Sequence, residues 1–140
     1  MKNVSAKEYL NQFITMQLEI KRKRMRLEIL KETATDISVH YDENMVQKSK
    51  ANSPFENILV MIMELEKEIQ SDIEKLEKQR QEFWIYLSKL SNEKYEAILW
   101  YRYAEYKSFE FIARKIGYSI RHTMRLHDKA VAELEELFKN

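Results

Sequence analysis

Cysteine is absent from this chain of 140 residues, and glycine and proline occur once each. Average usage is roughly 7% glycine and 5% proline, and folds that reverse direction often depend on these residues. β-Sandwiches, barrels and meanders are therefore disfavoured. The single glycine, Gly117, also excludes dinucleotide-binding fingerprints and phosphate loops, since both need several glycines. Without cysteine the chain forms no disulfide, thiol nucleophile, iron–sulfur cluster or cysteine-ligated zinc site.

Long apolar runs are also lacking. The longest covers six residues, 58–63, whereas a membrane-spanning helix needs about 20. The opening residues Met1, Lys2 and Asn3 do not begin a signal-peptide pattern. We therefore expect a soluble, cytoplasmic protein with no membrane partner.

The composition that remains is typical of long amphipathic helices. Charged residues make up 34% of the chain and hydrophobic residues 44%, and this combination predicts an all-α fold. The net charge is only +1, but charge is unevenly distributed. Residues 107–129 contain six basic and two acidic residues, a local excess of +4 that the average conceals.

Residues 5–36 show the heptad pattern of a helix with one narrow apolar stripe. A basic run, residues 21–24 with Arg26, crosses the stripe, and Lys23 stands where a zipper would carry an aliphatic side chain. We interpret this run as a solvated helix face, with a phosphate-binding patch as the alternative. The stripe consists of Ala6, Tyr9, Phe13, Met16, Ile20, Leu27, Leu30, Ala34 and Ile37.

A connector and a second long helix follow. Residues 38–53 lose the periodicity, which predicts an irregular connector. Ser53, Pro54 and Glu56 then provide an N-cap, a proline at the first helical position and an acid in the first turn, so a helix begins there. It is predicted to span about 35 residues. Its stripe is formed by Ile62, Ile69, Leu76, Phe83 and Leu90, accompanied by Leu59, Ile73 and Leu87.

Glu66 and Arg80 also occupy stripe positions of this second helix. Polar residues there disfavour an unbroken zipper and favour an antiparallel hairpin with the first helix, packed again in a dimer. We therefore predict that residues 1–90 form a long helical hairpin or coiled coil that serves oligomerisation or partner binding. Residues 91–140 are predicted to form a separate domain.

The last 50 residues carry signals for three shorter helices. Asn92 and its neighbours offer a cap for a helix that ends near Glu105, and Ser108 caps the next helix. Gly117 stands where a helix needs a left-handed residue at its end, and Ser119 can cap a third helix reaching about residue 138. Two helices joined by a turn of about three residues make a helix-turn-helix. Its predicted buried face comprises Ile112, Ala113, Ile116, Thr123, Leu126, Ala130 and Leu134.

With that face buried, Arg121 and Arg125 project from the opposite side of the third helix. Arginines one turn apart suit bidentate contact with guanine or with phosphates in a major groove. The stretch from about Tyr95 to Leu137 resembles region 4 of sigma-70-type factors. Three segments carry the resemblance. Residues 98–103 resemble the helix before the turn, residues 111–119 resemble the first helix of the turn motif and the turn itself, and residues 121–134 resemble the recognition helix.

The layout of the whole chain is similar to small phage-type transcriptional regulators, the ArpU/RinA-like late activators and their uncharacterised relatives. This resemblance implies a double-stranded DNA-binding regulator of phage or mobile-element origin in the bacterial or phage-infected host cytosol, with RNA polymerase as a further candidate partner. The long helices of residues 5–90 predict that it acts as a homodimer. Ile120 and Met124 depart from the polar residues of sigma factors and could contact thymine methyl groups instead. The candidate DNA-binding residues are Ser119, Ile120, Arg121, His122, Met124, Arg125, Lys129, Lys107 and Lys115.

Other interpretations have less support in the sequence. His122 and His127 are five residues apart, which places them on different helix faces, so no metal site is expected. Trp84, Trp100 and the nearby tyrosines Tyr101 and Tyr103 are interpreted as core rather than as a base-stacking platform. No acid–base pair, cofactor motif or small-molecule site is recognised, so no enzyme is predicted. The alternative function is a helical assembly or adaptor protein, either polymerase-binding or a packaging subunit of the small-terminase kind.

Overall fold

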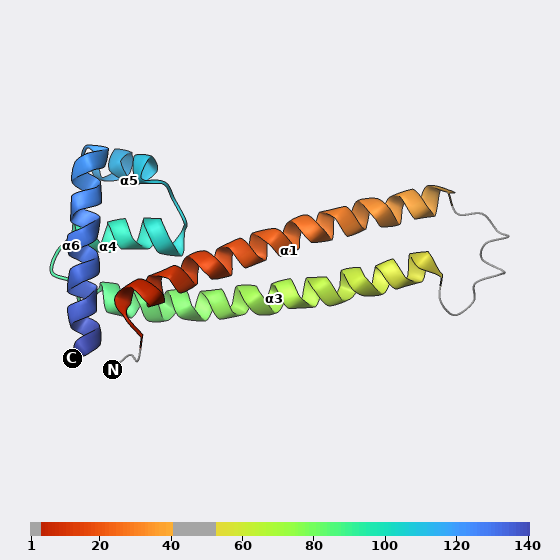
Figure 1. The fold of residues 1–140 in the computed structure, drawn as a ribbon, viewed down its shortest axis with the longest axis horizontal. Helices are drawn as coiled ribbons and strands as arrows, with labels where there is room; N and C mark the ends of the chain where they lie inside the picture. The colour runs from red at the N-terminus through yellow and green to blue at the C-terminus, as the bar shows by residue number, and fades with distance from the viewer. Residues whose placement is uncertain (1–3, 41–52) are drawn as a thin grey trace. The chain divides into compact units, whose positions relative to one another are not determined.

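The computed structural model describes residues 4–40 and 53–140, and every regular element in these ranges is helical (Figure 1). The all-α prediction is therefore confirmed. The elements are α1 (Ala6–His40), α3 (Pro54–Leu87), α4 (Glu93–Leu99), the π-helical turn η1 (Trp100–Ala104), α5 (Phe109–Ile116) and α6 (Ile120–Lys139). The predicted helix ending near Glu105 is thus α4 with its last turn widened to a π-helix.

The start of α3 lies where the sequence predicts it, whereas the end of α1 does not. Ser53 is buried and its hydroxyl accepts the Glu56 N–H at 3.0 Å, so α3 begins at Pro54. The predicted connector 38–53 is wrong at its start, because α1 continues through His40. No glycine or proline occurs in residues 37–53 to end the helix earlier. The rest of the connector, residues 41–52, lies outside the described residues.

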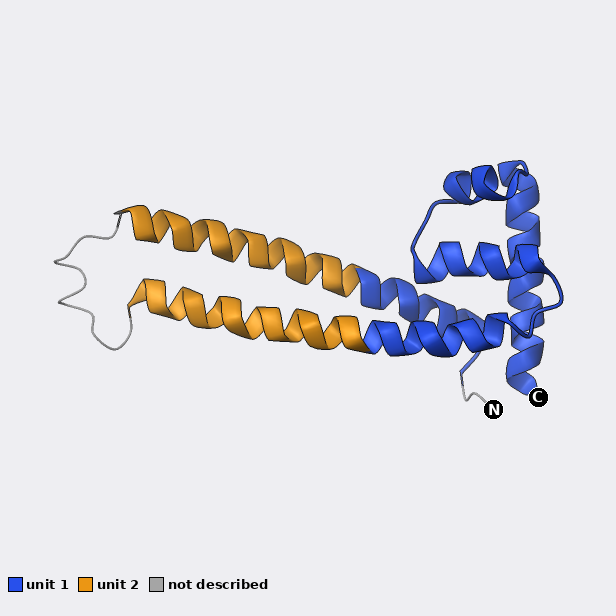
Figure 2. Cartoon of the chain, turned by 180° about the vertical axis from the view of Figure 1, so that it is seen from behind, with its two compact units in different colours: residues 1–17, 75–140 blue, residues 18–74 orange. Residues whose placement is uncertain are grey.

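The chain divides into two compact units (Figure 2). Unit 1 contains residues 1–17 and 75–140, and unit 2 contains residues 18–74. The boundary predicted at residue 90 falls inside unit 1, between α3 and α4. The short C-terminal helices therefore share a unit with the start of α1 and the end of α3.

In unit 2, the segments of α1 and α3 lie side by side and antiparallel (Figure 2). Lys23 contacts Asp72 at 2.8 Å and Lys31 contacts Glu66 at 3.6 Å, so contacts that advance along α1 move backward along α3. This is the hairpin geometry that the sequence predicts. Its buried seam holds Ile20, Ala34, Ile62, Leu65 and Ile69.

One predicted seam residue is misplaced. Leu59 is 40% exposed, whereas Ile62 three residues later is buried. The seam at this end of α3 runs from the half-buried Ile58 to Ile62, a spacing of four residues, and Leu59 is rotated by about 100° from Ile58. Leu65, which the sevenfold repeat did not include, is buried instead.

Aromatic side chains form the centre of unit 1. Tyr9 and Phe13 of α1 meet Phe83 of α3, with the Phe13 and Phe83 ring centroids 4.8 Å apart. Phe138 of α6 closes the cluster at 5.2 Å from Tyr9 and 4.9 Å from Tyr86. Burial, reinforced by the neighbouring Glu82 carboxylate, raises the pKa of the Tyr9 hydroxyl far above its ordinary value. The far end of α6 is therefore anchored in the same core as the ends of the hairpin.

Candidate nucleic-acid interface

The turn between α5 and α6 is built from three local signals. The Ser108 hydroxyl accepts the Phe111 N–H at 3.1 Å and caps α5. Gly117 ends α5 with a φ of 78°, and its N–H donates to the Ala113 carbonyl at 2.9 Å. A Cβ at this position would meet no atom within 4 Å, so glycine is needed for its left-handed backbone and not for space. Ser119 caps α6 two residues later.

α6 presents one buried face. Thr123, Ala130 and Leu134 are each 0% exposed, and the Thr123 hydroxyl donates back to the Ser119 carbonyl at 2.8 Å. Because that hydrogen bond satisfies the hydroxyl, the Thr123 side chain can be buried without cost from an unpaired donor. The helix packs on both α4 and α5. These contacts fix which side of α6 faces outward.

The outward side of α6 carries a row of basic residues. Arg121, Arg125 and Lys129 follow one another at intervals of four residues and all three are exposed. Within the part of the chain that the structure describes, neither arginine forms an ion pair. Their guanidinium groups therefore keep their donors available for a ligand. Asp128 also faces outward, next to His127 at 3.1 Å.

An apolar pair lies beside the basic row. Ile120 is 44% exposed and Met124 is 46% exposed, one helical turn apart. Nearly half of each side chain is open to solvent, so both can contact a ligand. Together, the basic row and the apolar pair make up the outward surface of α6 that the sequence predicts as candidate interface.

Three further predicted residues have roles within the fold. The Ser119 hydroxyl accepts the His122 N–H at 3.1 Å, so its first function is to cap the helix. Lys107 is half-buried, with its Nζ 5.0 Å from the Phe111 ring centroid, and Lys115 stands 5.8 Å from the same ring. Lys107 lies just before α5 and Lys115 lies in its last turn, so both flank α5 rather than extend the row on α6.

A small cluster beside the interface was missed by the sequence interpretation. The Lys94 ammonium lies 5.6 Å from the centroid of the exposed Tyr118 ring, which contacts the predicted His122 edge-on at 4.8 Å. Lys94 comes from α4, 24 positions before Tyr118 in the chain. No local pattern joins residues so far apart, so only the folded contact between α4 and the turn could reveal this cluster. It adds a cation and an aromatic side chain next to the start of α6.

The other histidine supports the fold. The Tyr103 hydroxyl lies 2.6 Å from His127 Nε2, and the His127 side chain is 15% exposed. Burial raises the pKa of Tyr103 above its ordinary value. His127 thus packs at the edge of the core, as predicted, and joins α6 to η1.

η1 itself is held by side chains from the hairpin ends. Arg80 donates through Nε and Nη2 to the Ala104 carbonyl, with the Nε bond at 3.0 Å. Gln17 donates to the Tyr103 carbonyl at 2.6 Å. A helix end leaves carbonyl groups without intrahelical partners, and these two side chains satisfy them. The support that positions α6 therefore includes residues from α1 and α3.

Trp84 contradicts its predicted place in the core, because it is 59% exposed. The Trp84 ring meets the Trp100 ring edge-on, with the centroids 5.2 Å apart. The other three aromatic residues predicted as core, Trp100, Tyr101 and Tyr103, are half-buried. The Trp84 position is one residue after the buried Phe83 and is rotated by about 100° out of the line from Phe83 to Leu87. Helical spacing alone did not show that Phe83 faces the core while Trp84 faces solvent.

Neither a metal-binding cluster nor a membrane-spanning helix is found in residues 4–40 and 53–140. In these ranges, no group of three or more histidine or acidic side chains is placed to hold a metal ion. None of the helices in the described ranges combines the length and apolarity required to cross a membrane. No family model, no curated protein and no solved structure matches this chain.

Proposed function

We propose that this protein is a double-stranded DNA-binding transcriptional regulator that inserts the first half of α6 into a major groove. The observation that carries the proposal is the outward surface of α6, where Arg121 and Arg125 are exposed one turn apart after a capped, left-handed turn. An arginine can donate two parallel hydrogen bonds to a guanine edge or to a phosphate. Lys129 continues the row and suits a backbone phosphate.

The remaining surface fits the same use. Ile120 and Met124 offer methyl and thioether groups to thymine methyls, while Lys94, Lys107 and Lys115 stand close enough to α5 and the turn to contact phosphates. Sequence information would then come from α6, and position on the duplex from the surrounding lysines. The protein would act as a homodimer in the cytosol of a bacterium or phage-infected host, with RNA polymerase as a further candidate partner and without catalytic activity.

The first experiment is selection of bound duplexes from a random-sequence pool, followed by affinity measurement on the recovered site. Arg121→Ala and Arg125→Ala should each weaken binding by about 1–3 kcal/mol, or roughly 5- to 150-fold. Lys78→Ala removes an exposed cation from α3 and serves as the matched control. We expect it to bind like the wild type. Failure to recover any preferred sequence, or full affinity in both arginine variants, would refute the proposal.

The second candidate function is an assembly or adaptor protein, and one observation favours it. Tyr118, Ile120 and Met124 are 41–46% exposed and close together in sequence, and exposed apolar residues that adjoin one another suit a protein partner. Light scattering separates the regulator from the packaging subunit. A packaging subunit should form a ring of eight or more chains, whereas the regulator should be a dimer.

A further inference from the structure

α1 carries a second apolar face in unit 2, separate from its contact with α3. Leu18, Met25 and Ile29 are 44%, 59% and 60% exposed. Their spacings of seven and four residues place them on one side of the helix. The seam residues Ile20 and Ala34 are buried, and a step of two residues on a helix turns a side chain by about 200°. The apolar face therefore points away from α3.

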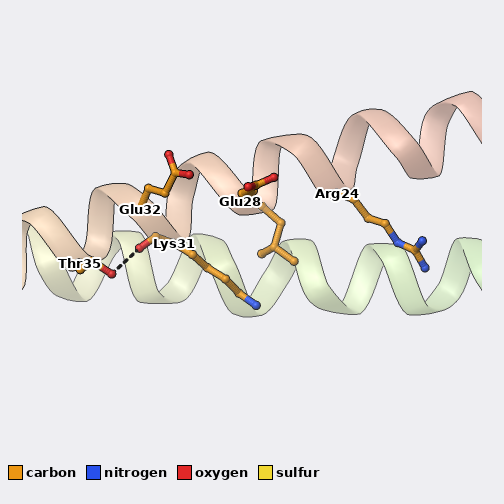
Figure 3. A pocket seen from close by; sticks show the side chains of 6 residues that line it. Arg24, Glu28, Lys31, Glu32 and Thr35 are labelled. Atoms are coloured by element: carbon orange, nitrogen blue, oxygen red, sulfur yellow. Dashed lines mark hydrogen bonds between the residues drawn. The ribbon is translucent and has the colours of Figure 1, made fainter.

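Charged residues on the same face are sorted by sign. Lys21 and Arg22 precede Met25 by one turn, while Glu32 and Asp36 follow Ile29 by one and two turns, and all four are exposed. Arg22 pairs with Glu19 on its own helix at 2.5 Å, and its side chain remains 66% exposed. Figure 3 shows the Glu32 carboxylate directed away from α3. We define the outward stripe as Leu18, Lys21, Arg22, Met25, Ile29, Glu32 and Asp36.

The charges along the outward stripe are complementary to those of a second copy when the two helices run antiparallel. If a second stripe is laid on the first in the opposite direction about a point midway between Met25 and Ile29, each Met25 meets an Ile29. The same superposition sets Arg22 opposite Glu32 of the other copy and Asp36 opposite Leu18, about one turn beyond Lys21, and two-fold symmetry makes this contact twice. A parallel arrangement would instead place basic against basic and acidic against acidic residues, which is destabilising.

We propose that the outward stripe of α1 is the contact between two copies of this chain, arranged antiparallel about residue 27. The apolar pair Met25 and Ile29 supplies the buried centre, and the charged groups at both ends select the orientation. Leu18 lies at the rim. The contact uses unit 2 alone, so it stands whether or not the protein binds DNA.

Charge reversal tests the pairing. In Lys21→Glu/Arg22→Glu the stripe is acidic at both ends, and in Glu32→Lys/Asp36→Lys it is basic at both ends. Sedimentation velocity should show a dimer for the wild type and a dimer dissociation constant raised about tenfold or more for each variant alone. An equimolar mixture of the two variants should recover a heterodimer, because opposite charges then face each other at both ends.

A matched control makes the same change of charge elsewhere. Lys75→Glu/Lys78→Glu reverses two exposed lysines on α3 and should dimerise like the wild type. Circular dichroism confirms that all variants keep their helix content. Dimers of unchanged affinity in both stripe variants, a monomeric wild type, or a mixture that stays monomeric would overturn the proposal.

The absence of cysteine allows the orientation to be tested directly. In the antiparallel contact, a Met25→Cys chain and an Ile29→Cys chain should form a disulfide when mixed and oxidised. Each variant alone should crosslink poorly, because two copies of one position lie four residues out of line, or about 6 Å along the axis. Efficient crosslinking of the Met25→Cys variant to itself, with no Ile29→Cys chain present, would show a parallel contact and contradict the proposal.

Discussion

Gly117 allows the turn geometry to be tested by a single methyl group. Its φ of 78° lies in the left-handed region, and an added Cβ would touch nothing within 4 Å. Gly117→Ala should therefore lose only the backbone preference, which costs roughly 1–2 kcal/mol for a residue with a Cβ. The same change restricts the unfolded chain and returns about 0.4–1 kcal/mol. We expect a net loss near 1 kcal/mol in the free energy of unfolding.

Urea denaturation followed by circular dichroism measures this loss, and the melting temperature should fall by about 2–4 °C. Gly117→Asn is the matched variant, because asparagine tolerates the left-handed region better than alanine. It should fall between the wild type and Gly117→Ala. If alanine were neutral, the turn would not need a left-handed residue. A loss above about 3 kcal/mol would mean that the methyl group meets a close contact.

Three further predictions concern the support of α6. Phe83→Ala removes a ring that is 0% exposed and should cost about 3–5 kcal/mol in urea denaturation; a loss below about 1 kcal/mol would place the core elsewhere. Arg80→Met removes the donors to the Ala104 carbonyl and should cost about 1–3 kcal/mol, whereas the exposed Arg26→Met should change stability by less than about 0.5 kcal/mol. Burial raises the pKa of Tyr9 above its unfolded value of 10.0, so the neutral phenol stabilises the fold below about pH 10 and that stability is lost at higher pH. Between about pH 10 and 12 the wild type should lose about 1.4 kcal/mol per pH unit more than Tyr9→Phe, and parallel curves would contradict this assignment.

The features predicted correctly from the sequence are those that depend on neighbours in the chain. Ser108 and Ser119 were recognised as caps, and Gly117 as a left-handed end, because each signal lies within a few residues of the helix that it begins or ends. The exposure of Arg121 and Arg125 followed from helix periodicity once the buried face was assigned.

The features that the sequence did not reveal join distant segments. Arg80 was noted only as a polar residue on an apolar stripe, and its partner at Ala104 lies 24 positions away. Glu133 carries no distinctive signal in the sequence, yet its carboxylate accepts the N–H and hydroxyl of Ser91, 42 positions away, at 2.5 and 2.8 Å. Heptad spacing also identified which helices are amphipathic without resolving a rotation of about 100°, as Leu59 and Trp84 show.

The central claim is that the outward surface of α6 contacts the DNA backbone and bases, and the salt dependence of binding tests it most directly. Fluorescence anisotropy on the selected duplex should give a linear decrease of log affinity with log salt, whose slope reports the number of phosphates neutralised. In Arg121→Ala/Arg125→Ala the slope should become shallower by about one for each phosphate contact removed, and affinity should fall as well. An unchanged slope together with unchanged affinity would show that these arginines do not meet DNA.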